Sequence, residues 1–553
     1  MYNDINKKYV MTSKRFCLNG LSRFFNAVNR MQIGRYEIFT DELNIDESNV
    51  ISVVKNAMTY HMINSNRIDY LLNFEAGAQP LVRTKEIRPE INIEDVDNLA
   101  HYITDFKCGY FWGNPITFVQ RGKKDKGIKE ESEAIALLNE SYESENIRAK
   151  TQELARFVEI GGIGYTYVDL KNNYKDGDSY FSVVTLDPRN TFIIKSSYYA
   201  DHRTMAAVSY RQKENGSRHY TIFTDALRID LDELVLRPEN EEPKTKWQIG
   251  RNGVFKNPFG IIPIVEWQRS PDRMGCFERQ IDEMNYLNVL LSNVGNEQED
   301  ETQCIYWCND VEFPLDENGN PIKPKTNDWV QTYTSRDGKT PKITPLTNPH
   351  DYASQLNVIY ATRARILEEC HVPQRNDNSG GSTGVAMADA AGWSDAETDA
   401  CKQQMTVEAC KVNELKVVCE VLKKSPDIEG DSPLLKLKYS DCQPNMKRSK
   451  NYELTVKSNT LATLLSHGIA PEHAIRVISL FDDPQQVLED SKEYLDRYYD
   501  REFGSEEEEP QGASNLPENQ IVNSPLIDGM SKENPKEETV TTIEKKEVKN
   551  EEG

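Results

Sequence analysis

The sequence reads NPFGIIPIVEW at residues 257–267 and RMGCFE at residues 273–278, and these two stretches decide the fold. In the first, Pro258 and Gly260 mark a turn, and the β-branched run that follows is typical of a buried strand. In the second, apolar residues begin to recur at spacings of three and four, which predicts a long amphipathic helix from about Gly275 to Glu301. Its apolar face holds Phe277, Ile281, Met284, Leu287, Leu291 and Val294.

A second long helix is predicted from about His350 to Cys370. Its apolar face holds Tyr352, Leu356, Ile359, Ile366 and Leu367. Between the two helices, strand-like pieces at 304–307 and 329–333 are joined through Asn318-Gly319 and followed by Asp337-Gly338, and both dipeptides favour hairpin turns. The pattern predicts a pair of helices that brackets a small β-rich insertion, a stalk with a head.

The residues before this pair predict a mixed α+β region. Helical patterns cover residues 50–74 and 99–109 and, as two helices, 131–160. Strand patterns cover residues 116–120, 165–170, 180–185, 191–194, 206–211 and 219–224. We expect one antiparallel sheet from about residue 160 to residue 267.

A polar loop follows the second long helix and precedes a third one. Residues 374–384, QRNDNSGGSTG, contain three glycines and no apolar side chain, which predicts a flexible, exposed loop. Ser394 and Glu397 have the spacing of a capping box, and they predict the start of a helix that ends near Lys424.

The C-terminal part changes in composition along its length. Residues 434–439 alternate like a strand, and residues 461–498 predict a small helical cluster. From Ser505 onward thirteen Asp or Glu face five Lys, with almost no aromatic residues. Such a segment buries too little apolar surface to fold, so we expect a disordered acidic tail.

The net charge of the 553-residue chain is −23. A protein that grips duplex DNA through its phosphates needs a surplus of Lys and Arg, so the net charge argues against a wrapping or groove-reading DNA binder. An acidic wall does suit a conduit, because it repels a moving polyanion and prevents it from sticking. No stretch reaches the roughly 18 apolar residues of a membrane helix, and we expect no membrane span.

The N-terminus is locally basic and also apolar. Its basic residues include Lys7, Lys8, Lys14, Arg15 and Arg23, and its apolar residues include Phe16, Leu18, Leu21, Phe24 and Phe25. A transit peptide and a docked amphipathic helix both fit this pattern, and we favour the docked helix.

Short motifs that resemble phosphate-binding or metal-binding signatures lack residues that these signatures require. DGKT at 337–340 ends like a phosphate-binding loop, but Tyr333 stands where its first glycine belongs. The EF-hand-like start at Asp316 has Pro321 at the position that needs glycine, which favours a hairpin turn instead. The ten cysteines have no paired metal-ligand spacing, and we expect buried, reduced thiols of a protein made in a reducing cytoplasm. We therefore predict no enzyme, no metal site and no cofactor.

Several segments, taken together and in order, resemble the portal proteins of long-tailed bacteriophages. They are GAQPL at 77–81, FKCGYFWGNP at 106–115, DPRNTF at 187–192, the two opening stretches continued to residue 285, and GGSTGVA at 380–386 followed by Gly392-Trp393. Two positions depart from the family pattern. Cys276 replaces the acidic residue that often follows Gly275, and Ser382-Thr383 replace the usual double serine. The resemblance covers about residues 75 to 395.

The resemblance implies an α+β portal fold with named regions. These are a wing at 1–268, a first stem helix at 269–300, a clip at 301–346, a second stem helix at 347–371, a tunnel loop with its adjoining segment at 372–393, a long helix returning to the wing at 394–445, a helical crown at 446–503 and the acidic tail at 504–553.

It also implies a function. The chain would form a dodecameric ring at one capsid vertex of the virion, made in the host bacterial cytoplasm, through which double-stranded DNA is packaged and ejected. The implied partners are the terminase motor, head-completion or adaptor proteins, and the major capsid and scaffolding proteins. Another packaging component, such as a terminase subunit, is the alternative, against which the missing P-loop and the acidic balance count. A helical cytoplasmic scaffold would not explain the Gly-rich loop between two long helices.

Two sets of residues are candidates for function within this scheme. The tunnel loop would present polar residues to DNA, with one Arg whose charge a nearby Asp offsets. These residues are Gln374, Arg375, Asn376, Asp377, Asn378 and Ser379. In the clip, Tyr306, Trp307 and Trp329 are candidate docking contacts, and packing within the clip or between subunits remains an equal alternative for each.

Overall fold

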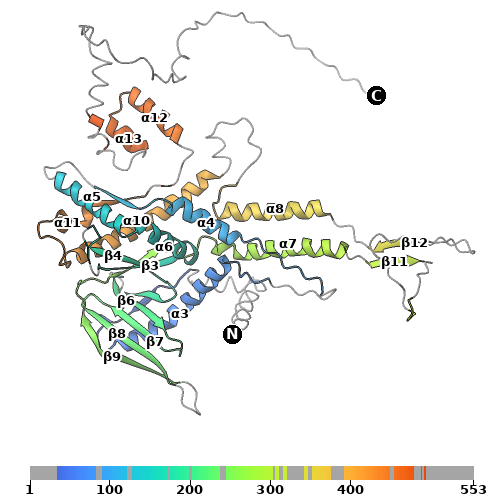
Figure 1. Ribbon diagram of the computed structural model, residues 1–553, viewed down its shortest axis with the longest axis horizontal. Helices are drawn as coiled ribbons and strands as arrows, with labels where there is room; N and C mark the ends of the chain where they lie inside the picture. The colour runs from blue at the N-terminus through green and yellow to red at the C-terminus, as the bar shows by residue number, and fades with distance from the viewer. Residues whose placement is uncertain are drawn as a thin grey trace, which may run out of the picture. The chain divides into compact units, whose positions relative to one another are not determined.

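The computed structural model shows a mixed α+β protein (Figure 1), which confirms the predicted fold class. The residues that the structure describes are 34–81, 90–120, 128–171, 174–175, 177–198, 202–236, 244–302, 305–309, 316–319, 342–346, 351–374, 392–446, 448, 454–478, 487 and 491–492. Nearly all of them belong to the first of two compact units, Met1–Pro484, and the second unit is Gln485–Gly553. Among the described residues, no helix has the length and apolar character needed to cross a membrane.

The larger sheet has six strands in the order β1-β5-β6-β7-β8-β9. Their bounds are Ile38–Thr40 (β1), Thr191–Ser196 (β5), Thr204–Gln212 (β6), Arg218–Phe223 (β7), Leu227–Leu236 (β8) and Lys244–Lys256 (β9). Helix α3 (Val50–Glu75) covers one face of this sheet and buries Val50, Val54 and Met58 against it. These residues recur at spacings of four, which places them on one side of the helix.

A second, three-stranded sheet has the order β10-β3-β4 and is antiparallel. Its strands are β3 (Ile163–Leu170), β4 (Phe181–Leu186) and β10 (Ile264–Gln268), so the expectation of a single sheet is wrong. The chain leaves β9 through the turn at 257–263, where the Asn257 side chain donates to the carbonyl oxygens of Thr224 and Ile261, each at 2.8 Å. Pro258 and Pro263 cannot donate to a continued ladder, which ends the first sheet there.

Helices and the C-terminal return pack around the second sheet. The elements are α4 (Leu99–Trp112), α5 (Ile128–Ser144), α6 (Ile147–Gly161), α10 (Trp393–Leu422) and α11 (Pro433–Lys436), with β2 (Thr117–Gln120) paired to β13 (Cys442–Asn445). One apolar core joins Phe118, Phe181 and Val265 of the N-terminal part to Leu415 and Val418 of α10. Residues 394–445 therefore fold back onto the N-terminal α+β region.

The predicted pair of long helices is confirmed as α7 (Ile281–Thr302) and α8 (Tyr352–Glu369), with a short 3₁₀ turn, η1 (Glu278–Gln280), before α7. Contacts of Gln280 with Glu369, Arg365 with Glu283 and Gln355 with Glu297 show that the two helices run antiparallel. The predicted apolar faces meet, and the fully buried members include Phe277, Met284, Leu287, Ile359 and Ile366. Leu356 is an exception, because 39% of it is exposed.

Two predictions about helix ends need correction. Helix α4 continues to Trp112 instead of ending at Gly109, because the aromatic side chains of its last turn are buried and Trp112 packs on Trp267. Helix α10 begins after Gly392, and no side chain caps it. The expected capping box is therefore absent, and Glu397 instead accepts a hydrogen bond from Tyr110 Oη at 2.6 Å.

The strand expected at 434–439 is also wrong. Pro433 opens the short helix α11, since proline is favoured at the first helical position, and a 3₁₀ turn, η2 (Tyr439–Asp441), follows. The strand of this region is β13, a few residues later. Helices α12 (Leu454–Ser466) and α13 (Pro471–Ile478) confirm part of the helical cluster. The acidic tail and the basic N-terminus lie outside the described residues.

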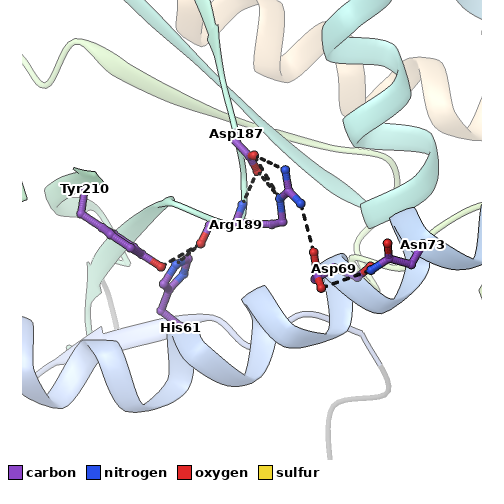
Figure 2. Close-up of polar contacts among 6 residues, drawn as sticks. All are labelled: His61, Asp69, Asn73, Asp187, Arg189 and Tyr210. Carbon is purple, nitrogen blue, oxygen red and sulfur yellow. Dashed lines mark hydrogen bonds and ion pairs between the residues drawn. The ribbon is translucent and has the colours of Figure 1, made fainter. Parts of the chain in front are cut away.

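The DPRN turn at 187–190 fixes the larger sheet to α3 (Figure 2). The Arg189 guanidinium binds Asp187 at 2.7 Å and Asp69 of α3 at 3.0 Å. The backbone carbonyl oxygen of Arg189 accepts hydrogen bonds from Tyr210 Oη at 3.0 Å and from Nε2 of the buried His61, on α3, at 2.9 Å. The motif thus holds helix and sheet together through both its side chain and its backbone.

Candidate functional site

The predicted DNA-facing residues fall at the end of α8. Gln374 is the one that the structure describes, and its Nε2 donates to the Ala364 carbonyl oxygen at 2.7 Å. This bond folds the Gln374 side chain back onto α8. The other five candidates, Arg375 to Ser379, belong to residues 375–391, which lie outside the described residues.

The insertion between α7 and α8 contains a hairpin. Strand β11 (Ile305–Asn309) pairs antiparallel with β12 (Lys342–Leu346), and Tyr306 lies opposite Pro345. The expected partner strand, 329–333, lies outside the described residues together with Trp329. Trp307 is 56% exposed, so its ring is available to a partner. The turn predicted at Asn318-Gly319 is confirmed, since Gly319 has φ +81°.

Both ends of residues 375–391 are held by one buried cation. The ammonium group of Lys107, on α4, donates to the His371 carbonyl oxygen at 3.3 Å and to Asp399 Oδ2 of α10 at 2.7 Å. Close by, the Cα of Pro373 lies 3.9 Å from where a Cβ of Gly392 would stand. The chain therefore leaves α8 and enters α10 at nearly the same place, so the two ends of residues 375–391 lie close together.

Lys107 belongs to a larger buried network. Arg269, just after β10, binds Asp399 at 2.8 Å and Glu159 of α6 at 2.9 Å, and Trp112 Nε1 donates to Glu159 at 2.9 Å. Burial alone would raise the pKa of the Asp399 carboxyl, but Arg269 and Lys107 outweigh it and lower that pKa. The network joins α4, α6, α10 and the ends of β10 and α8, and it includes residues on both sides of residues 375–391 in the chain.

Three thiols lie at the same junction, on α4, before α7 and at the end of α8. Burial raises the pKa of Cys276 and of Cys370 to about 12, and it raises the pKa of Cys108 further. At neutral pH these thiols are protonated and poor nucleophiles. Their role here is packing, in agreement with the predicted buried thiols, but Cys401 of α10 is exposed and contradicts that prediction. Within the described residues no group of His, Cys, Asp and Glu is placed to hold a metal ion.

The RMGCFE stretch anchors the start of α7. A Cβ on Gly275 would lie 2.1 Å from the Ile160 carbonyl oxygen, and one on Gly162 would lie 2.5 Å from the Arg273 carbonyl oxygen. Arg273 itself makes a bidentate pair with the buried Glu266, both bonds at 2.8 Å. Burial opposes the charge of Glu266, but Arg273 lowers its pKa to about 2. This motif therefore serves close packing and not catalysis.

Residues 91–97, here called the strap, run along α7. Backbone amides of the strap donate to three α7 side chains, Ile93 to Asn296 at 3.0 Å, Asp95 to Ser292 at 3.0 Å and Asp97 to Asn288 at 3.1 Å. Four helical residues advance about 6 Å, and two extended residues advance about 6.6 Å, so side chains at i, i+4 and i+8 can meet every second residue of an extended chain. The strap therefore belongs physically to α7, although the sequence analysis places it in the wing.

Lys107, Asp399 and the strap contacts were not anticipated from the sequence. Lys107 stands in the aromatic block at 106–115, and no local pattern there points to a partner 292 positions later in the chain. The α7 residues had a readable signal, because Asn288, Ser292 and Asn296 form a polar stripe at spacings of four beside an apolar face. Such a stripe on a buried helix predicts a backbone partner, since buried polar groups are hydrogen-bonded.

The fold and site define a mixed α+β protein with a pair of antiparallel helices, α7 and α8, that brackets a pair of antiparallel strands, β11 and β12. A family model described as "Phage portal protein, SPP1 Gp6-like" matches residues 59–498. The match covers most of the chain, so the chain belongs to this family of phage portal proteins, as the sequence resemblance suggested. No curated protein matches the chain. The alternative of a terminase subunit is not favoured.

Proposed function

We propose that the chain forms a ring of identical copies around a channel for double-stranded DNA, at one vertex of the capsid. The observation that carries this proposal is the α7–α8 pair with its terminal hairpin, in a chain of the portal family. The role is structural and not enzymatic. In the virion we expect a dodecamer.

Exposed apolar side chains on the helical pair support self-association. Tyr360 is 64% exposed, and Val358, Leu356 and Tyr286 are also exposed on α8 and α7. Large apolar groups left open on two long helices mark an interaction surface, because burying them from water is favourable. A neighbouring copy, presenting the same two helices, would cover them in a closed ring.

We assign the regions of the portal fold to the elements of the structure. The two sheets with α3 to α6 would form the wing, α7 and α8 the stem, β11 and β12 the clip, and the helices from α12 onward the crown facing the capsid interior. We assign the strap to the stem, because its backbone is bound along α7. Capsid and scaffolding proteins would surround the wing.

The loop at 372–383 is proposed as the tunnel loop that touches DNA. Its polar, Gly-rich sequence recognises shape and not bases, and one Arg per copy beside an Asp gives phosphate contacts without strong net attraction. The Lys107 contacts that hold both ends of residues 375–391 give the loop a fixed base. Sliding of DNA is favoured over gripping.

The hairpin is proposed as the docking site of the terminase motor during packaging and of head-completion proteins afterwards. The exposure of Trp307 supports a contact role for this ring, since exposed Trp residues are frequent anchors of interfaces. Deleting residues 316–326 should spare ring formation and abolish binding of the motor or adaptor in a pull-down. Normal docking after this deletion would refute the assignment.

The ring itself is tested by the mass of the purified protein. Mass photometry should give a closed oligomer, and Tyr360→Asp should weaken it by placing a charge in the proposed contact. Lys438→Asp, on an exposed residue near η2, serves as the control. A ring of thirteen formed outside the capsid would still agree with the proposal, whereas a stable monomer at micromolar concentration would not.

A further inference from the structure

The larger sheet ends in two outer strands, β1 and β9. Within the described residues each of them pairs with one neighbouring strand. Five spacings of about 4.8 Å place these edges roughly 24 Å apart. Because they are opposite edges of one sheet, they face opposite directions.

The first edge is acidic. Residues 37–47, which include β1 and the turn after it, contain five Asp or Glu and no Lys or Arg. Glu37 is bound by Lys195 at 2.6 Å, and the other four carboxylates, at 41, 42, 46 and 47, are exposed. Among them Phe39 is 45% exposed and Leu43 is 65% exposed. Apolar side chains ringed by charges have the anatomy of an interface.

The second edge is basic. Strand β9 contains Lys244, Lys246, Arg251 and Lys256 and no acidic residue. Lys246 and Lys256 are exposed. Phe255 is 48% exposed, and the Arg228 guanidinium lies over its ring at 5.8 Å. Residues 237–243, which precede β9 and contain three Glu, lie outside the described residues.

We propose that the acidic edge of one copy contacts the basic edge of the next copy around the ring. This inference rests on the proposed ring. A closed ring needs two different surfaces on opposite flanks of each subunit, and these edges differ in charge and face opposite ways. The contact is made by side chains, because β1 has only three residues and cannot carry a long shared ladder. Phe39 and Phe255 supply the apolar centre.

Charge reversal in two separate chains tests the proposal. The basic-edge variant is Lys246→Glu with Lys256→Glu, and the acidic-edge variant is Asp41→Lys with Glu42→Lys. Each variant alone brings like charges together at every contact, so the concentration at half-dissociation of the ring should rise roughly tenfold or more. A chain that carries all four changes restores opposite charges and should assemble as the unmodified chain does.

Mixing the two variants gives the sharpest result. In a mixed ring every contact is favourable only when the two variants alternate, so assemblies should form and should contain even numbers of subunits. Native mass spectrometry counts them. The proposal would be overturned if either variant alone formed rings of the usual stability, or if mixing the two variants did not restore ring assembly.

Controls separate this proposal from the others. Lys402→Glu with Lys438→Glu changes the net charge equally at exposed positions of α10 and near η2, and it should leave the ring intact. Should the unmodified chain fail to form a ring, the proposed function itself fails.

If the basic residues 1–33 cover the acidic edge instead, deleting them should weaken the ring as the acidic-edge variant does, while the basic-edge variant has no effect. That result also overturns the proposal. Circular dichroism verifies folding, and milder Lys→Gln changes at 246 and 256 replace any variant that unfolds.

Discussion

Asn296 of α7 binds both backbone polar groups of Ile93, accepting from its N–H at 3.0 Å and donating to its carbonyl oxygen at 2.9 Å. A residue of the N-terminal region is thereby paired to a helix 203 positions later in the chain. Asn296 is buried, so breaking the pair would leave polar groups without water or partner. We conclude that strap and helix move as one body.

A disulfide between strap and helix tests this conclusion. A Cβ built on Gly295 lies 3.8 Å from the Ile93 Cβ, the mean Cβ separation of natural disulfides, so Ile93→Cys with Gly295→Cys should cross-link without strain. We expect the oxidised form to unfold with about 2–4 kcal/mol more stability than the reduced form and to package DNA at the normal rate. Asn92→Cys with Gly295→Cys is the control that should not cross-link. Packaging blocked only by oxidation would show that the strap must detach.

Gly275→Ala should be severely destabilising. The new Cβ would lie 2.1 Å from the Ile160 carbonyl oxygen, so α6 and the start of α7 would have to separate. We expect a loss of about 3 kcal/mol in urea unfolding, at the upper end of the range for forced overpacking of a core. Gly109→Ala is the matched control, since no atom within 4 Å meets its Cβ and alanine favours the helix interior. Equal stability of the two variants would contradict the packing account.

His61 should make folding stability depend on pH between 4 and 6.5. Burial lowers the pKa of His61 from 6.5 to about 4, with Arg218 lowering it further, while the Arg189 carbonyl oxygen and Asp187 raise it. In that window the unfolded chain binds a proton at His61 and the folded chain does not, so this contribution to stability is complete above pH 6.5 and falls as the pH drops. The loss should approach about 3 kcal/mol near pH 4.

His61→Gln can still donate to the Arg189 carbonyl oxygen but cannot titrate. Its unfolding free energy should therefore lose this part of the pH dependence, while the carboxylates continue to contribute at lower pH. An unchanged pH profile in the variant would mean that the folded and unfolded chains bind a proton at His61 equally, so that its pKa is not lowered in the fold.

The Lys107–Asp399 pair should be strongly coupled. Lys107→Met leaves the His371 carbonyl oxygen without the ammonium group, while the Asp399 carboxylate keeps Arg269 at 2.8 Å, so we expect a cost of about 3 kcal/mol, the lower end for breaking a buried pair. In a double-mutant cycle with Asp399→Leu, the two changes should cost less together than the sum of the single changes. Hydrogen exchange should rise at 371–374 and 392–399 in the Lys107 variant. Additive effects of the two changes on the free energy of unfolding, together with unchanged hydrogen exchange at these residues, would show that the pair does not stabilise the ends of residues 375–391.

Stiffening the loop should impair translocation and not assembly. Gly380→Pro with Gly381→Pro restricts the backbone of the proposed tunnel loop, so we expect a reduced packaging rate from rings of normal mass. Gly430→Ala, where no atom within 4 Å meets the added Cβ, is a neutral control. Full-length packaging at the normal rate by the proline variant would place the loop outside the DNA path.

The sequence predicted elements with strong apolar periodicity and missed those set by distant contacts. Helices α3, α7 and α8 were predictable because their buried residues recur on one face. Strand β9 was not, since Gly250 and Gly253 interrupt it, and a Cβ on Gly253 would lie 2.7 Å from the Asp230 carbonyl oxygen at the bulge opposite. The Lys107–Asp399 pair joins residues 292 positions apart, which no local pattern reveals.

Single-particle electron microscopy of the purified protein tests the central claim most directly. The account predicts top views of a ring with a central hole wide enough for duplex DNA and with one copy per repeat of its rotational symmetry. Images of a monomer, or of a compact assembly without a central hole, would contradict it.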